Sequence, residues 1–149
     1  MHPFDLRAAL LAKHAQHVVL IHFPIALFTA GVVFDFLAQW TKNRLLAATA
    51  YYNLLAAALT TLPVLVTGLL AWQWQLEGQR LKGILLWHLV AGCVSSALIW
   101  LVWLVHQRAQ RERREYLPGY RLHLEAVGVA LLALTGHLGG FLSGVNAPR

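Results

Sequence analysis

Long apolar runs dominate the pattern of hydrophobic and polar positions along this chain of 149 residues. A bilayer core about 30 Å thick is crossed by a helix of roughly 20 apolar residues. Stretches of that kind are expected over residues 18–40, 45–72, 83–105 and 122–145, the last apolar from Ala126 onward. Backbone polar groups in lipid are satisfied only within a helix or a closed barrel. The pattern therefore predicts an all-α integral membrane protein, a four-helix up-down bundle.

Composition supports the same class. Hydrophobic residues make up 58% of the chain and charged residues only 12%, against about 45–50% and about 25% in soluble domains. The expected partner is therefore the lipid bilayer, with the chain crossing it several times. Residues 1–17 lack the apolar core and small-residue cleavage site of a signal peptide. They are expected to form an interfacial segment or a solvated start.

Lysine and arginine are distributed unevenly between the two sides of this topology. Seven of the twelve lie on the side of the connections that follow the first and third spans, and most of the seven lie in the short stretch HQRAQRERREYLPGYR, residues 106–121. The positive-inside rule then predicts that this loop is cytoplasmic and that both termini are periplasmic, in a bacterial inner membrane. Topology also explains the net charge of +6, so no nucleic-acid partner is expected.

Three histidines are expected at one depth, although they belong to three different spans. At about 1.5 Å per residue, His22, His88 and His137 each lie within roughly 7–14 Å of the outer face. An ionisable side chain inside a span marks a pathway, a ligand or a buried hydrogen-bonded pair. Imidazole is an axial ligand of haem iron and a ligand of zinc and copper. The layer is thus a candidate metal or cofactor site, and the alternative is a set of interhelical hydrogen bonds.

His17 is a further candidate ligand. It precedes His22 by five residues, about 140° around a continuous helix, so the two share a face only if the helix breaks at Pro24. By contrast, His106 and His123 flank the arginine-rich loop and are expected to be solvated.

Glycines near these histidines favour haem among the candidate cofactors. Gly136, Gly140 and Gly144 form a stripe in the fourth span, Gly92 follows His88 by one turn, and Gly68 lies at a similar depth in the second span. A flat macrocycle needs such room between helices, although a helix-packing seam is the other interpretation of the stripe. At the outer mouth, Arg80 is a candidate partner for haem propionates.

A mononuclear three-histidine metal site is the competing chemistry. Such a site needs polar groups that orient its ligands, and no acidic residue is expected at this depth. Asp35 is expected to pair with Lys42 or Arg44, and Glu125 with Arg121. These pairings leave b-type haem as the preferred cofactor. Covalent c-type haem is excluded because Cys93 is the sole cysteine of the chain.

The segments HVVLIHFPIAL and FDFLA resemble the opening signature of the bacterial membrane family catalogued as domain of unknown function 2231. Residues similar to the signature are His17, His22, Phe23, Pro24 and Asp35, with Val18 in place of the family's first proline. His88 resembles the histidine of the family's third helix, and GHLGGFLSGVN resembles its Gly-Gly element and tail. Because domains of this family occur beside Rieske-type or c-type cytochrome modules, the resemblance implies periplasmic redox work.

Together these features predict an electron-transfer subunit that binds b-type haem in the outer half of the bundle and works with other membrane or periplasmic redox subunits. Two of His22, His88 and His137 would be the axial ligands, with the diagonal pair His22 and His88 preferred. The alternative is a non-catalytic structural or anchoring subunit of a larger respiratory or photosynthetic complex. Six acidic residues in total, with none near the histidine layer, argue against a stand-alone enzyme.

Overall fold

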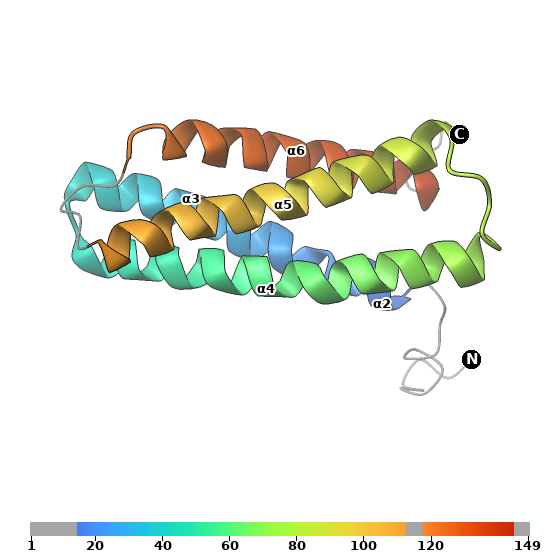
Figure 1. The fold of residues 1–149 in the computed structure, drawn as a ribbon, viewed down its shortest axis with the longest axis horizontal. Coiled ribbons are helices and arrows are strands. Elements are labelled where there is room, and N and C mark those ends of the chain that lie inside the picture. The colour runs from blue at the N-terminus through green and yellow to red at the C-terminus, as the bar shows by residue number, and fades with distance from the viewer. Residues whose placement is uncertain (1–14, 113–117, 145–149) are drawn as a thin grey trace.

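The computed structural model describes residues 15–112 and 118–144, and these residues form helices joined by turns. The helices are α2 (Ala15–Leu20), α3 (His22–Thr41), α4 (Arg44–Gln75), α5 (Gly83–Arg111) and α6 (Arg121–Leu142). In Figure 1 the four long helices lie side by side and alternate in direction. Neighbouring pairs are α3 with α4, α4 with α5, α5 with α6 and α6 with α3, so α3 and α5 are diagonal, as the up-down order requires.

The described residues contain four helical segments that are long and apolar enough to cross a membrane, namely Gln16–Thr41, Arg44–Trp74, Gly83–Arg111 and Arg121–Leu142. The predicted all-helical membrane bundle is therefore confirmed. The third helix runs past the expected end at residue 105 because a helix does not have to stop at the first charged position. The fourth ends before residue 145, at Leu142, and Gly144 follows with φ +79°, a conformation that glycine adopts without strain.

The first span is broken between α2 and α3. Ile21 separates the two helices, and the backbone N–H of Ile21 still donates to the carbonyl of His17 at 3.0 Å. Pro24 has no N–H to donate to the carbonyl of Leu20, and its ring crowds that carbonyl. The break thus follows from Pro24, although it lies three residues earlier in the chain. Of the interfacial segment expected over residues 1–17, residues 1–14 lie outside the described part of the structure.

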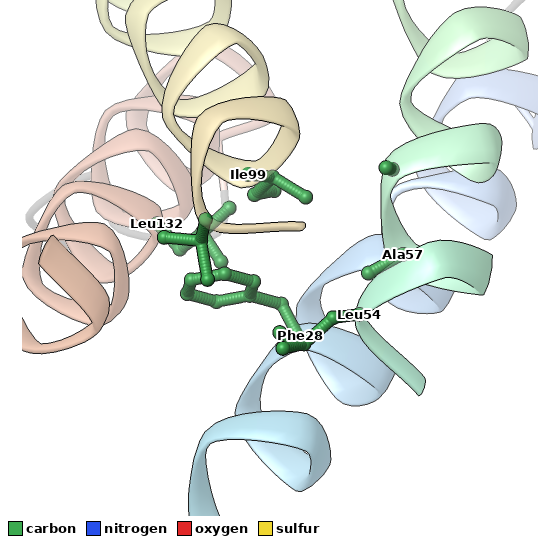
Figure 2. Packing of buried hydrophobic residues seen from close by; sticks show 7 residues of the cluster. Phe28, Leu54, Ala57, Ile99 and Leu132 are labelled. Atoms are coloured by element: carbon green, nitrogen blue, oxygen red, sulfur yellow. The ribbon is translucent and has the colours of Figure 1, made fainter. Parts of the chain in front are cut away.

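Phe28 is the centre of the core. Its ring is fully buried, and it extends from α3 towards Leu132 of α6, beside Ile99 of α5 and across from Leu54 and Ala57 of α4 (Figure 2). Lipid tails are as apolar as these side chains, so helices in a membrane associate through close packing rather than through the hydrophobic effect.

Two glycines permit that packing. A Cβ on Gly128 would lie 2.7 Å from Cζ of Phe28, and a Cβ on Gly31 would lie 2.9 Å from Cδ2 of Leu54. The core therefore depends on the absence of a side chain at both positions.

The two ends of the bundle differ in their polar residues. The end at which residues 42–43, 112 and 118–120 lie is called here the Arg-rich end, and the opposite end, which holds α2 and residues 76–82, the α2 end (Figure 1). Each end holds one group of inward-facing polar side chains, and the two groups are described separately below.

Candidate functional site

At the α2 end, His17 of α2 and His88 of α5 lie close together. Their ring centroids are 6.5 Å apart and their planes are nearly perpendicular, at 88°. Both side chains are half-buried. Ile21, between α2 and α3, keeps helical dihedral angles, φ −59° and ψ −26°, and α2 packs against α4 as well as α3. Two imidazoles from different helices thus converge at one point inside the bundle.

The ring of His88 is oriented by α6. Its Nδ1 donates to the backbone carbonyl of Thr135 at 3.1 Å, so Nε2 carries the lone pair. Thr135 is held in turn: its hydroxyl donates to the carbonyl of Leu131 at 2.7 Å and lies 3.1 Å from the hydroxyl of Ser95. This arrangement is the one that prepares a histidine to bind a metal through Nε2.

The ring of His17 is oriented by α4. Its Nδ1 lies 3.3 Å from the hydroxyl of Thr67, and that hydroxyl donates to the carbonyl of Pro63 at 2.8 Å. Because the hydroxyl proton is used towards Pro63, the oxygen accepts from Nδ1 of His17 and leaves the lone pair on Nε2. The same tautomer results as in His88.

Two glycines make room for the imidazoles. A Cβ on Gly68 would lie 2.9 Å from Cε1 of His17, and a Cβ on Gly139 would lie 3.1 Å from Cε1 of His88. Any other residue at Gly68 would displace the His17 ring. These two glycines accommodate histidine side chains, and the expectation of a haem slot at Gly92, Gly136 and Gly140 stays a prediction.

The structure does not bring the other two histidines of the expected layer into this pair. His22 is exposed, its Nδ1 lies 2.7 Å from the carbonyl of Val18 in the preceding turn, and its side chain borders an open apolar groove on the outward face of α3. His137 is also exposed, and its ring lies 4.9 Å from the ring of Phe141, one turn further along α6. The ring contact between His17 and His88 is therefore an addition to the expected layer of His22, His88 and His137, which stays a prediction.

The remaining sequence candidates are three glycines and one arginine. Gly92 faces α6, where a Cβ would approach Cγ2 of Thr135 at 3.8 Å, and a Cβ on Gly136 would have no neighbour within 4 Å. Gly140 is half-buried on α6, and Arg80 is exposed in the connection between α4 and α5. Among these, Arg80 is at the α2 end and therefore on the same side of the bundle as the histidine pair.

Comparison with known protein families gives one match, and it covers the histidine pair. The family model for a predicted membrane protein, DUF2231, matches residues 13–146, which include His17, His88 and all four spans. The chain belongs to the DUF2231 family. No curated protein and no solved structure among those compared matches it.

A second polar group in this DUF2231 protein lies at the Arg-rich end and was not expected. Nε of Arg121 donates to Oδ2 of Asp35 at 2.7 Å, and both side chains are buried. Beside them, Nε2 of His106 lies 3.0 Å from Oε1 of Glu125, again with both side chains buried. Arg121 also donates to Gln39 at 2.8 Å. Side chains of α3, α5 and α6 thus form one buried cluster.

This cluster corrects two predictions for the DUF2231 chain, the partner of Asp35 and the solvation of His106. Asp35 pairs with Arg121 rather than with Lys42 or Arg44, because α3 and α6 are neighbours and the end of one lies beside the start of the other. Lys42, which was expected to pair with Asp35, is the residue at which α3 ends, in a left-handed conformation with φ 56°. The carboxylate of Glu125 is hydrogen-bonded to His106, which is 3% exposed and not solvated.

One signal in the sequence does indicate the cluster. Asp35, Arg121 and Glu125 are charged residues within or at the edge of apolar spans, and such residues almost always face the bundle interior and pair with one another. Arg121 and His106 also flank the arginine-rich loop, so their positions in the sequence are equally compatible with a solvated loop. His123, on the opposite side of α6, is exposed as expected.

Proposed function

We propose that the protein is a membrane electron-transfer subunit in which His17 and His88 are the axial ligands of one b-type haem. The observation that supports this proposal is the convergence of two imidazoles with ring centroids 6.5 Å apart, each with Nδ1 engaged by its own partner. Bonds from imidazole nitrogen to a metal are about 2.0–2.1 Å long, so an ion held by both rings would need ring centres no more than about 6 Å apart. The separation of the His17 and His88 rings is close to that value.

The residues around the pair have defined tasks in this proposal. The carbonyl of Thr135 and the hydroxyl of Thr67 hold the two Nδ1 protons and direct the Nε2 lone pairs to the ligand. Two neutral histidines add no charge to the membrane interior. The cofactor supplies reversible one-electron transfer when it is bound. Arg80, exposed at the same end, is the proposed partner of the propionates.

The membrane placement belongs to the same proposal. The excess of Lys and Arg at the Arg-rich end favours a cytoplasmic position for that end. The α2 end and both termini then face the periplasm of a bacterial inner membrane. A site at that end is accessible to periplasmic or membrane redox subunits, which are the proposed partners.

Visible absorption spectra of the detergent-purified protein test the proposal. With haem supplied during expression, we expect a Soret band, and sharp α and β bands after reduction by dithionite. His17→Ala and His88→Ala are expected to abolish haem retention. His22→Ala and His137→Ala are the matched controls, because both side chains are exposed, and they are expected to retain haem. The perpendicular ring planes further predict a strongly anisotropic low-spin EPR signal of the oxidised form.

Two results would contradict the proposal. Loss of haem in the His22 or His137 variant, with retention in the His17 variant, would return the ligand role to the residues of the expected layer. A colourless wild-type protein that co-purifies with a larger assembly would instead support the structural or anchoring subunit, with the histidines acting as interhelical hydrogen-bond partners.

A further inference from the structure

The buried cluster at the Arg-rich end holds three groups of the kinds that bind metal ions. Within the described residues, Asp35, His106 and Glu125 each offer one ligand atom, and these atoms all lie within 4.8 Å of one another. The three residues come from three helices, α3, α5 and α6. Each is buried, so their positions are set by helix packing rather than by flexible loops.

An unpartnered oxygen gives independent support. Oε1 of Glu125 is hydrogen-bonded to His106, but Oε2 is buried and has no hydrogen-bond partner among the described residues. Glu125 itself is 0% exposed. A buried carboxylate oxygen without a partner costs free energy, and such a group in a native structure calls for a bound species that the protein atoms do not supply.

The charges of the cluster favour a cation. The groups that interact electrostatically with Glu125 are Asp35, His106 and Arg121. Arg121 engages Oδ2 of Asp35, and with His106 neutral the two carboxylates exceed the single guanidinium by one negative charge. Two carboxylates and one imidazole are ligands that suit borderline divalent ions such as zinc, manganese and iron.

We propose that Asp35, His106 and Glu125 form a binding site for one divalent transition-metal ion at the Arg-rich end. Nε2 of His106, a carboxylate oxygen of Glu125 and one of Asp35 are the ligands, and Arg121 keeps Asp35 in position. Binding through Nε2 requires the neutral imidazole of His106 to carry its proton on Nδ1, so the bonds from His106 and Glu125 to the ion take the place of their hydrogen bond. His106 and His88 are 18 residues apart on α5, about 27 Å along the helix, so this site does not depend on the proposed haem.

Cobalt and zinc titrations of the full chain in detergent, purified without a histidine tag, test this site. Isothermal calorimetry with Zn²⁺ and visible spectroscopy with Co²⁺ are expected to show one ion per chain. Glu125→Gln and Asp35→Asn keep the shape of each side chain and are expected to weaken binding at least about tenfold. His123→Ala removes an exposed histidine two residues from Glu125 and is expected to bind as the wild type does.

Zinc-edge X-ray absorption of the wild type provides a test that needs no variant. One imidazole nitrogen among oxygen ligands is the expected coordination. Two imidazoles, or loss of binding in His88→Ala, would place the ion at the α2 end and overturn the proposal. It would also be overturned by a wild type without saturable binding, in which case the cluster is an ion-pair network that retains a proton, or by unchanged affinity in both carboxamide variants. Far-UV circular dichroism and gel filtration identify any variant that has lost its fold.

Discussion

At the scale of single residues, the hydrogen bonds at Nδ1 decide what the two histidines of the α2 end are able to bind. His88 depends on a backbone carbonyl, which no side-chain substitution removes, whereas His17 depends on the hydroxyl of Thr67. Without that hydroxyl, Nδ1 of His17 loses the acceptor that favours its protonated tautomer. A substitution can therefore remove the hydrogen-bond partner of His17 but not that of His88.

Thr67→Val is the substitution that tests this dependence. Valine keeps the shape of threonine but accepts no hydrogen bond, so we expect haem affinity to fall about 10- to 100-fold, the usual cost of removing a partner of a ligating histidine. Titration of the haem-free protein with haem, followed at the Soret band, measures the change.

Thr60→Val is the matched control, because the hydroxyl of Thr60 donates only to carbonyls of its own helix, at Ala56 and Ala57. Haem affinity is expected to stay within about twofold of the wild type in this variant. Equal affinities in the Thr67 and Thr60 variants would show that the Thr67 hydroxyl does not position His17.

Residue identity alone made the histidines of the spans candidates but did not predict that His17 and His88 lie in contact. The angle of about 140° between His17 and His22 indicates that one faces inwards and the other outwards, and both have apolar neighbours, so the pattern does not distinguish them. What distinguishes them is tertiary: the space at Gly68 and the acceptor at Thr67 both lie on α4, distant from either histidine in the sequence.

At the scale of elements, the helices were predictable and their contacts were not. Hydrophobic length determined the four spans, and the described helices match them closely. The partner of Asp35 was missed because a search along one helix found Lys42 and Arg44, whereas Arg121 is 86 residues distant in the chain. Which helices are neighbours has to be known before buried pairs are assigned.

The contact between Phe28 of α3 and Gly128 of α6 makes a prediction about these elements. Gly128→Ala places a methyl group 2.7 Å from the Phe28 ring, so the ring or the helix has to move. Overpacking of this kind costs about 1–3 kcal/mol. Reversible unfolding in mixed micelles with increasing SDS, followed by circular dichroism, measures the loss of stability.

Two further variants test whether the contact with Phe28 causes the loss of stability in Gly128→Ala. Gly136→Ala adds the same methyl group to the same helix where no atom lies within 4 Å, and its stability is expected to stay within about 0.5 kcal/mol of the wild type. Phe28→Leu combined with Gly128→Ala is expected to be less than additive, because the smaller side chain leaves room for the methyl group. Full additivity would contradict a direct clash.

At the scale of the whole molecule, the bundle separates two polar sites by most of its length. The histidine pair lies at the α2 end and the acidic cluster at the Arg-rich end, while the residues between them, from Phe28 to Leu132, form an apolar core. Which side of the membrane each site serves depends on the orientation of the bundle.

That orientation is tested with reporter fusions. Seven Lys and Arg residues at the Arg-rich end against five at the other predict that the Arg-rich end is cytoplasmic. Alkaline phosphatase fused after Arg149 is therefore expected to be active and a green fluorescent protein there to be dark, and fusions after Glu112 are expected to give the reverse. Substituting Arg111, Arg113 and Arg114 by alanine reverses the excess and is expected to produce a mixed population. Bright fluorescence from the C-terminal fusion of the wild type would contradict the prediction and place the histidine pair on the cytoplasmic side.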